Sequence, residues 1–431
     1  MAALPTTYTI PGIHVTDRAA TVPLDWSSPG GETLTVFVRE VVAAHRRSED
    51  LPLLLFLQGG PGGKGPRPAG PADGWLGAAL ERFRVVLLDQ RGTGRSTPVS
   101  ARRLAAVGDG AAQAEHLAHF RADSIVRDAE HVRRTLYGGR RWSTLGQSYG
   151  GFITLTYLSL APEALDACYV TGGLPGLTAS AREVYERTQP RVAARNAVFR
   201  ERFPADVAVV RRVVDRVAAG GVVLPCGDPL TVPRVQALGM GLGMKQGVDA
   251  LHWILDEAFD TDGELTGTFL AQVEAATSFR ANPLYAVVHE SIYAQSHTGP
   301  TAWAAAQVRD ADPAFAPGAD PLLFTGEMIY PHMVEQAELR GLRAAADALA
   351  ARDGWDDLYD VERLAANEVP VEAAVYFDDL YVDAGLSLDT AARVGCTRAW
   401  VTNEHEHDGL RVGGVLPVLL GRMDERGLPR R

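Results

Sequence analysis

Ser148 stands in the sequence Gly-Gln-Ser-Tyr-Gly at residues 146–150, where a strand-like pattern gives way to a helical one. The stretch before it, residues 142–145, is short and mostly apolar, and an apolar helical run follows from Phe152 to Leu160. Glycine tolerates the unusual dihedral angles of so tight a turn, and larger side chains would clash at its flanks. A serine held there presents its hydroxyl at a helix N-terminus, where free amides favour developing negative charge. This context predicts a nucleophilic serine.

A serine hydroxyl attacks well only when a base removes its proton, and that base needs an acid to orient it. When such a serine lies on a strand-to-helix turn, the acid and then the histidine follow it along the chain. Of the eleven histidines, only His405 and His407 lie beyond the last strand-like stretch, residues 398–401. We expect His407 to be the base, because it is nearer the glycine-bearing turn that leads into the last helix. His405 remains the alternative.

The acid should follow the strand expected at residues 371–377. Asp378, Asp379 and Asp383 are all within reach, and at least two of them must be surface turn residues or helix caps. If the strand alternation continues through Asp378, then Asp379 begins the turn and can point over the sheet. Asp379 is therefore the expected acid.

The oxyanion of a tetrahedral intermediate needs backbone donors that are already in position. One donor is expected from the residue after the nucleophile, Tyr149. The other should come from the Gly-rich loop at residues 58–63, which follows an apolar strand-like run. We expect the Gly60 amide to be this second donor, with Gly59 as the alternative.

A third Gly-rich loop, residues 89–96, follows the apolar run at residues 85–88. It has no P-loop lysine, so a phosphate-binding role is disfavoured. An aspartate and an arginine beside a tight turn, Asp89 and Arg91, more simply brace neighbouring loops by ion pairing and hydrogen bonds.

Strands that alternate with helices indicate an α/β fold with a mostly parallel central sheet flanked by helices. The first 50 residues are strand-like, and nearly continuous apolar runs at residues 53–57 and 85–88 suit central strands covered on both faces. From about residue 178 to residue 351 the pattern is largely helical. The expected organisation is a core in two parts, residues 1–177 and 352–431, split by an inserted helical cap at residues 178–351.

Composition excludes several classes of protein. The 431 residues carry a net charge of −11 and no basic stripe, which argues against nucleic-acid binding. The N-terminal residues 1–22 lack a secretory pattern, and no apolar stretch is long enough to span a bilayer, so we expect a cytoplasmic protein away from membranes. The three cysteines are far apart and form no metal-binding pair, so we expect buried thiols in a reducing compartment.

Three motifs in this order and spacing resemble the prolyl aminopeptidase (proline iminopeptidase) family of α/β hydrolases. They are the Gln-Gly-Gly-Pro-Gly run at residues 58–62, the Asp-Gln-Arg-Gly-Thr-Gly-Arg-Ser run at residues 89–96, and the serine motif at residues 146–151. The resemblance extends to residues 378–382 and 403–409. It implies an α/β-hydrolase fold with a cap and a serine exopeptidase that removes an N-terminal proline from peptides, without metal or cofactor. It also assigns Ser148, Asp379 and His407 to the catalytic triad.

The resemblance has one visible departure, because many members begin the first motif with histidine where this chain has Gln58. We expect altered hydrogen bonding in that loop rather than lost activity. The substrate of such an enzyme carries a cationic N-terminus, and family members bind it with cap glutamates. Glu290 and Glu327, each in an aromatic-rich stretch of the expected cap, are the candidates. A buried carboxylate there needs a cationic partner to offset its desolvation.

Two other functions remain open at this stage. The same triad would serve an esterase or amidase that acts on another small acyl group. A noncatalytic binding protein could also use the fold, because a fold does not determine function. The oligomeric state, the substrate length and the tolerance beyond proline are not determined by the sequence.

Overall fold

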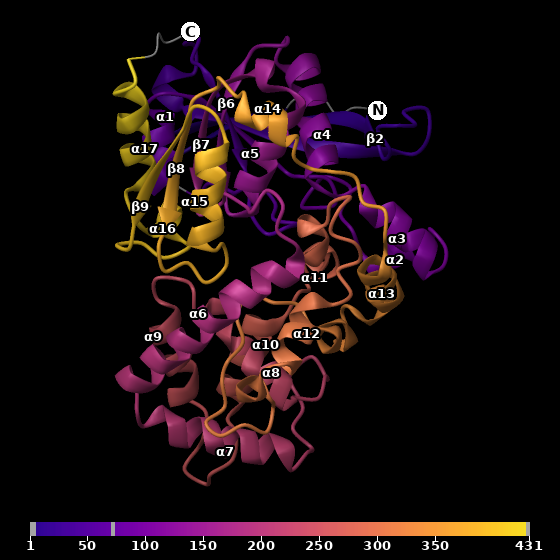
Figure 1. The fold of residues 1–431 in the computed structure, drawn as a ribbon, viewed down its shortest axis with the longest axis vertical. Helices are drawn as coiled ribbons and strands as arrows, with labels where there is room; N and C mark the ends of the chain where they lie inside the picture. Colours follow the sequence, from indigo (N-terminus) through magenta and orange to yellow (C-terminus); the bar gives the residue numbers. More distant parts are fainter. Residues whose placement is uncertain (1–5, 70–73, 428–431) are drawn as a thin grey trace.

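The computed structural model describes residues 6–69 and 74–427 and centres on a single twisted sheet (Figure 1). Within these residues the sheet has nine strands in the order β1-β2-β3-β5-β4-β6-β7-β8-β9. The strands are β1 (Thr6–Ile10), β2 (Ile13–Pro23), β3 (Thr33–Ala43), β4 (Leu53–Leu57), β5 (Arg84–Leu88), β6 (Trp142–Gln147), β7 (Leu165–Thr171), β8 (Val371–Tyr376) and β9 (Thr397–Thr402).

The sheet changes from antiparallel to parallel at β5. The strands β1, β2, β3 and β5 pair antiparallel, with tight register across the first hairpin (Ile10 opposite Ile13), whereas β5, β4, β6, β7, β8 and β9 pair parallel. Parallel strands need crossover connections, which place helices on both faces. All five residues of β4 are buried, as expected for a strand covered on both sides. The predicted α/β class and mostly parallel sheet are confirmed.

Helices cover the sheet and fill the region between β7 and β8. They are α1 (Gly74–Leu80), α2 (Ala101–Leu104), α3 (Gly110–Ala118), α4 (Ala122–Leu136), α5 (Tyr149–Leu160), α6 (Ala181–Arg202), α7 (Asp206–Ala218), α8 (Val232–Gln236), α9 (Gly247–Asp256), α10 (Gly267–Thr277), α11 (Pro283–Val288), α12 (Ala304–Asp310), α13 (Arg343–Ala351), α14 (Val361–Ala365), α15 (Ala384–Arg393), α16 (Gly409–Val412) and α17 (Val415–Asp424). Among the described residues, none of these helices is both long and apolar enough to cross a membrane.

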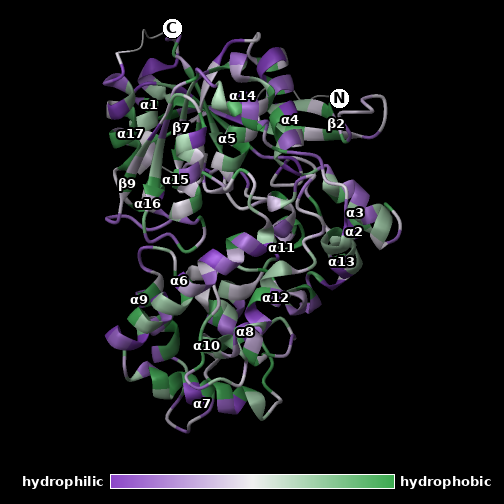
Figure 2. Ribbon diagram, in the orientation of Figure 1, coloured by the Kyte–Doolittle hydropathy of each residue, from purple (hydrophilic) through white to green (hydrophobic). Residues whose placement is uncertain are grey.

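The helices from α6 to α13 form a separate layer below the carboxyl ends of the strands in Figure 1. Figure 2 shows the hydrophobic colour concentrated on the central strands and α5, whereas α6 carries many hydrophilic residues. The short helix α3, from the first part of the chain, packs against α13. The division of the chain at residues 178 and 351 remains a prediction. For brevity, the helical layer between β7 and β8 is called the cap.

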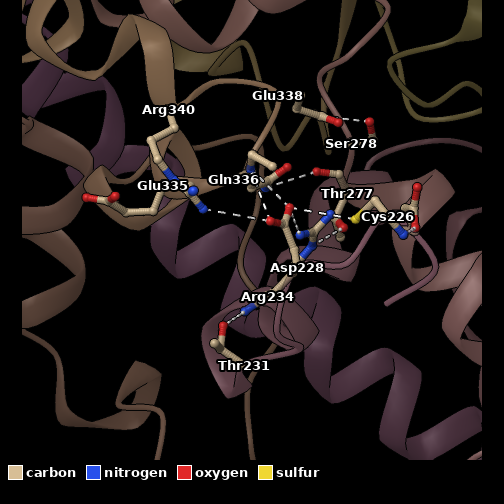
Figure 3. A network of polar contacts seen from close by, with 12 residues as sticks. Cys226, Asp228, Thr231, Arg234, Thr277, Ser278, Glu335, Gln336, Glu338 and Arg340 are labelled. Atoms are coloured by element: carbon tan, nitrogen blue, oxygen red, sulfur yellow. Dashed lines mark hydrogen bonds and ion pairs between the residues drawn. The ribbon is translucent and has the colours of Figure 1, made fainter. Parts of the chain in front are cut away.

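A buried polar network holds distant parts of the cap together (Figure 3). Asp228 accepts hydrogen bonds from the Ala337 amide and forms an ion pair with Arg234 at 3.3 Å. Arg234 Nε in turn donates to Thr277 Oγ1 at 2.9 Å, so the loop before α8, the end of α10 and the stretch after residue 335 share one set of contacts. These bonds join segments of the cap that are distant in the sequence.

The cysteines are all free, but they differ in exposure. Cys168 is buried in β7, Cys226 is half-buried and Cys396 is exposed. The expectation of buried thiols is therefore wrong for Cys396, which lies in the surface turn between α15 and β9.

The loop after β5 braces its surroundings, as its aspartate and arginine predict. Asp89 is fully buried and accepts bonds from both terminal nitrogens of Arg67, at 2.8 and 2.5 Å. Arg91 is also buried, and it binds Asp128 of α4 through Nε at 2.8 Å and Nη2 at 2.6 Å. The remaining donors of Arg91 reach backbone carbonyls of Pro23, Leu24 and His119. A bidentate pair with every donor occupied locks the loop to α4 and to the end of β2.

Replacement of Asp128 by alanine is expected to leave a buried, uncompensated guanidinium. The loss should be about 3–5 kcal/mol of unfolding free energy, because removing one partner of a buried pair leaves the other charge desolvated. Urea unfolding followed by circular dichroism measures it. Asp389→Ala is the control, since its pair with Arg393 is exposed (59% and 35%), and less than about 1 kcal/mol is expected there. Equal losses in the two variants would contradict the bracing role of Arg91.

Candidate active site

The predicted nucleophile Ser148 occupies the single residue between β6 and α5, so the strand and helix expected on either side of it are confirmed. Its backbone lies at φ 55° and ψ −126°, a region that residues with a Cβ rarely adopt. Such a conformation costs about 1–3 kcal/mol and persists only where its surroundings impose it. Here the Ser148 amide donates to the Thr171 carbonyl at 3.0 Å, and the Ser148 carbonyl accepts from the Gly151 amide at 2.7 Å.

Close backbone contacts explain the glycines on each side of Ser148. A Cβ on Gly146 would collide with the Gly150 carbonyl, and a Cβ on Gly150 would collide with the carbonyl of Leu57 at the end of β4. Neither obstacle is a flexible side chain that could move aside. The turn therefore packs backbone against backbone, and only glycine fits there.

His407 and Asp379 meet in a buried hydrogen bond. Asp379 lies in the loop after β8, and His407 lies in the loop between β9 and α16. His407 Nδ1 and Asp379 Oδ2 are 2.8 Å apart, and both residues are almost fully buried. The other oxygen, Asp379 Oδ1, accepts from the amides of Tyr381 at 2.8 Å and Val382 at 3.0 Å. The carboxylate is thus fully bonded and can hold the ring in one orientation.

The sheet topology brings Ser148 to the same edge. Ser148 follows β6, Asp379 follows β8 and His407 follows β9, and these strands are parallel, so their carboxyl ends lie together. The end of β7 lies between the first two. Its Thr171 carbonyl binds the Ser148 amide, while a Cβ on Gly172 would lie 3.3 Å from Asp379 Oδ2.

The structure separates the alternatives that the sequence left open. Asp378 is exposed, whereas Asp383 caps α15 by accepting from the Leu386 amide at 2.9 Å and pairs with Arg191. His405 packs edge-on against the rings of Tyr376 and Trp400. Of these candidates, only His407 and Asp379 are brought together.

The charge state of His407 reflects two opposing effects. Burial of the ring disfavours the protonated form, but the carboxylate of Asp379 and its hydrogen bond outweigh burial, so the pKa of His407 lies above its ordinary value of 6.5. Glu327 raises the pKa further, and Arg411 acts in the opposite direction. The surroundings of the ring thus favour its protonated form.

The Gly-rich loop after β4 lies directly against the serine. A Cβ on Gly59 would lie 2.8 Å from Ser148 Cβ, so the backbone at residue 59 is in contact with Ser148. Gly60 has φ 131°, which favours glycine. The Tyr149 amide is the first of α5 and has no acceptor within the helix. Gln58 stands where many members of the resembled family have histidine. Its backbone carbonyl accepts a hydrogen bond from Gln90 Nε2 at 2.7 Å.

Glu327 lies in the cap close to the buried pair. Its Oε1 accepts from the Tyr285 hydroxyl at 2.6 Å. Burial raises the pKa of Glu327 to about 7, while the nearby His407 and the Tyr285 hydroxyl act to lower it. No arginine or lysine forms an ion pair with this carboxylate among the residues that the structure describes. It therefore lies beside the pair as a half-buried acid with no arginine or lysine partner among the described residues.

Glu290 has a different environment. Its oxygens accept from the amides of Ala304 at 3.1 Å and Ala305 at 2.9 Å, at the start of α12. Burial raises its pKa to about 7, against these bonds. The residues just before α12, Ala302 and Trp303, have φ 50° and 55°, so the Glu290 carboxylate caps a helix that begins from a strained turn. Tyr185, a buried phenol, lies within the electrostatic reach of both glutamates.

Two residues that contact this site, Tyr285 and Tyr381, are not among the site residues expected from the sequence. Tyr285 reaches Glu327 from 42 positions away, and no spacing rule connects them. Tyr381 packs edge-on against His407 with ring centroids 4.7 Å apart, although its position two residues after Asp379 offers a weak signal. The first contact forms within the cap, and the second joins the loops that follow β8 and β9.

Comparison with known proteins identifies the family. The model of the α/β hydrolase fold matches residues 52–214. The chain is 47% identical to a proline iminopeptidase of Aeromonas sobria over 417 residues, which covers 95% of this chain and 96% of that protein. It is 36% identical to proline iminopeptidase aneH of Aspergillus aculeatus, covering 94% of this chain and 92% of that protein. Together with the strained serine turn on a parallel sheet, these similarities show that the chain belongs to the proline iminopeptidase family of α/β hydrolases.

Proposed function

We propose that this protein is a serine exopeptidase that releases an N-terminal proline, or a similar small residue, from peptides with a free N-terminus. The observation that carries this proposal is the half-buried carboxylate of Glu327, which lies beside the His407–Asp379 pair and has no arginine or lysine partner among the described residues. A hydrolase of blocked acyl groups has no use for an unpaired acid there, whereas a cationic terminus would supply its missing partner. The names of the Aeromonas and Aspergillus relatives point to the same substrate.

In the proposed reaction, Ser148 Oγ attacks the carbonyl carbon of the N-terminal residue, and His407 accepts the serine proton. Asp379 holds the ring in the tautomer that leaves Nε2 free to accept and stabilises the imidazolium that forms. As the carbon–nitrogen bond breaks, His407 gives the proton to the leaving amine. Water then attacks the acyl-serine, again with His407 as base, and the free amino acid is released.

The oxyanion that forms during each attack carries charge beside Ser148. We propose that the Tyr149 amide at the start of α5 and the Gly60 amide of the neighbouring loop donate to it. Contact between residue 59 and Ser148 supports a donor from this loop, and the dipole of α5 adds a favourable field.

Selection of a free terminus is assigned to the cap, which we place at residues 178–351. In this proposal the substrate ammonium pairs directly with Glu327. Glu290, whose oxygens are engaged by α12, contributes negative charge from behind without touching the amine. The cation that enters offsets the desolvation of Glu327, so binding and ionisation of this residue are coupled.

Substitution of Asp379 by asparagine tests the triad. The amide oxygen can still accept from Tyr381 and Val382, but the amide nitrogen would donate to His407 Nδ1 and place the ring proton on Nε2. The expected loss in kcat is about 10⁴-fold with the fold retained, measured by release of p-nitroaniline from proline p-nitroanilide. Asp378→Asn, one residue away and exposed, should behave as wild type. A kcat for Asp379→Asn within tenfold of wild type would remove Asp379 from the mechanism.

Substitution of Glu327 by glutamine tests recognition of the amine. We expect kcat/KM for proline p-nitroanilide to fall about a hundredfold, while the slow turnover of acetyl-proline p-nitroanilide is unchanged. Below pH 7 the wild-type KM should rise as Glu327, with its pKa of about 7, becomes protonated, and the variant should lack this rise. The acid limb of kcat should also move to lower pH, because Glu327 no longer raises the pKa of His407.

Glu290→Gln provides the matched control for this experiment. It should weaken the cap of α12 and lower the thermal unfolding midpoint, but change the preference for free over blocked substrate much less than Glu327→Gln does. An unchanged preference in Glu327→Gln, or equal turnover of both substrates by wild type, would exclude the proposed recognition of the amine.

A further inference from the structure

The proposed base, His407, lies in a loop that forms hydrogen bonds with the cap. This base loop, residues 403–409, is bonded to the cap arm, residues 240–245. The His407 amide donates to the Gly243 carbonyl at 3.2 Å, and the Lys245 amide donates to Asp408 Oδ1 at 3.0 Å. His407 is thus hydrogen-bonded both to Asp379, which follows a strand of the sheet, and to the cap arm.

An arginine of α6 adds a third connection. Arg195 Nε donates to the Leu242 carbonyl of the cap arm at 3.1 Å, and Arg195 Nη2 pairs with Glu406 of the base loop at 2.6 Å. Both members of the ion pair are largely buried, at 20% and 17% exposure, so this contact holds more firmly than a surface pair.

Tyr381 contacts Asp379, His407 and the cap arm. Its amide donates to Asp379 Oδ1, and its ring stands edge-on to His407, nearly perpendicular at 86°. Its hydroxyl donates to the Met240 carbonyl at 2.5 Å and accepts from the Gly243 amide at 3.1 Å. The residue is buried, with 4% exposure.

The cap arm presses closely on this ring. A Cβ on Gly243 would lie 2.6 Å from Tyr381 Cζ, so the arm backbone is in direct contact with the phenol. Aromatic edge-to-face packing favours one ring orientation over others. The hydrogen bond to Asp379 leaves the imidazole free to tilt about the Nδ1–Oδ2 line, and the Tyr381 ring restricts that tilt.

We propose that Tyr381 is a positioning residue through which the seated cap arm orients the imidazole of His407 for proton transfer. The inference rests on the proposed serine mechanism but not on the preference for proline. Its physical basis is that a misalignment of about 1 Å in a reacting group can cost about a hundredfold in rate. The cap therefore acts on the base as well as on the substrate.

Tyr381→Phe tests this inference, because it keeps the ring and removes both hydroxyl bonds to the arm. We expect kcat for proline p-nitroanilide to fall about tenfold with KM within about twofold, as a loosened base loses part of its contribution. The labelling rate of Ser148 by a fluorophosphonate should fall in parallel. The groups that face His407 are Asp379, Glu327 and Arg411. A looser hydrogen bond between His407 and Asp379 would raise the pKa of His407 less. The acid limb of the pH profile of kcat should therefore move to lower pH.

Tyr157→Phe is the matched control. Tyr157 is equally buried, and its hydroxyl also makes two bonds, accepting from Trp142 Nε1 at 3.0 Å and donating to Glu130 Oε1 at 2.5 Å. It should lose stability without a change in kcat or in the acid limb. Equal effects in the two variants, or an unchanged kcat and acid limb in Tyr381→Phe, would overturn the proposal.

Gly243→Ala perturbs the same contact from the cap side and serves if Tyr381→Phe does not fold. Its Cβ would push against the phenol while all catalytic groups remain. The expected result is the same fall in kcat and the same shift of the acid limb, and wild-type behaviour would overturn the proposal. Fluorophosphonate labelling tests the role of Tyr381 independently of the proposed proline substrate. A wild type that is labelled but does not cleave proline p-nitroanilide rejects the proposed substrate, and the labelling rates of the variants still decide the role of Tyr381.

Discussion

The buried hydrogen bond between His407 and Asp379 is the contact on which the rest of the site depends. It joins loops that follow two neighbouring parallel strands, β8 and β9, whose carboxyl ends lie at the same edge of the sheet as that of β6. Asp379 is the main group that offsets the effect of burial on the pKa of His407. The carboxylate therefore raises the pKa of the base and holds its Nδ1 in place, while the Tyr381 ring packs edge-on against the imidazole.

Two features of the site are unfavourable in free energy, and the stability of the surrounding fold offsets each of them. The strained backbone of Ser148 is held by bonds to Thr171 and Gly151, between glycines that permit backbone contact on both sides. Glu327 is half-buried and accepts from the Tyr285 hydroxyl, and desolvation raises its pKa to about 7, so its ionised form is disfavoured in the free protein. Natural proteins accept such local costs at functional positions because the same features act on the substrate.

The cap contributes more than a cover. It supplies the Glu327 carboxylate near the base, and it touches the base loop through the cap arm and Arg195. The polar network around Asp228 joins segments of the cap that are distant in the sequence. Glu327 of the cap also raises the pKa of His407, so its charge is coupled to protonation of the base.

The sequence by itself determined the elements and much of the site. Period-two and continuous apolar patterns located β3 to β8, and the glycines around Ser148 located the turn, because these signals are local. Chain order reduced eleven histidines to two. It could not separate His407 from His405, or Asp379 from its neighbours, because the choice depends on which side chain points over the sheet edge. The tertiary structure brings His407, and not His405, to Asp379. It uses Glu290 to cap a helix, whereas no arginine or lysine pairs with Glu327 among the described residues. It also brings Tyr285, Gly243 and Tyr381 to the site. The contacts of Glu290 and Glu327 form when the cap itself folds, and the contact of Gly243 with Tyr381 forms where the cap packs against the sheet, so none of them follows from a local sequence pattern.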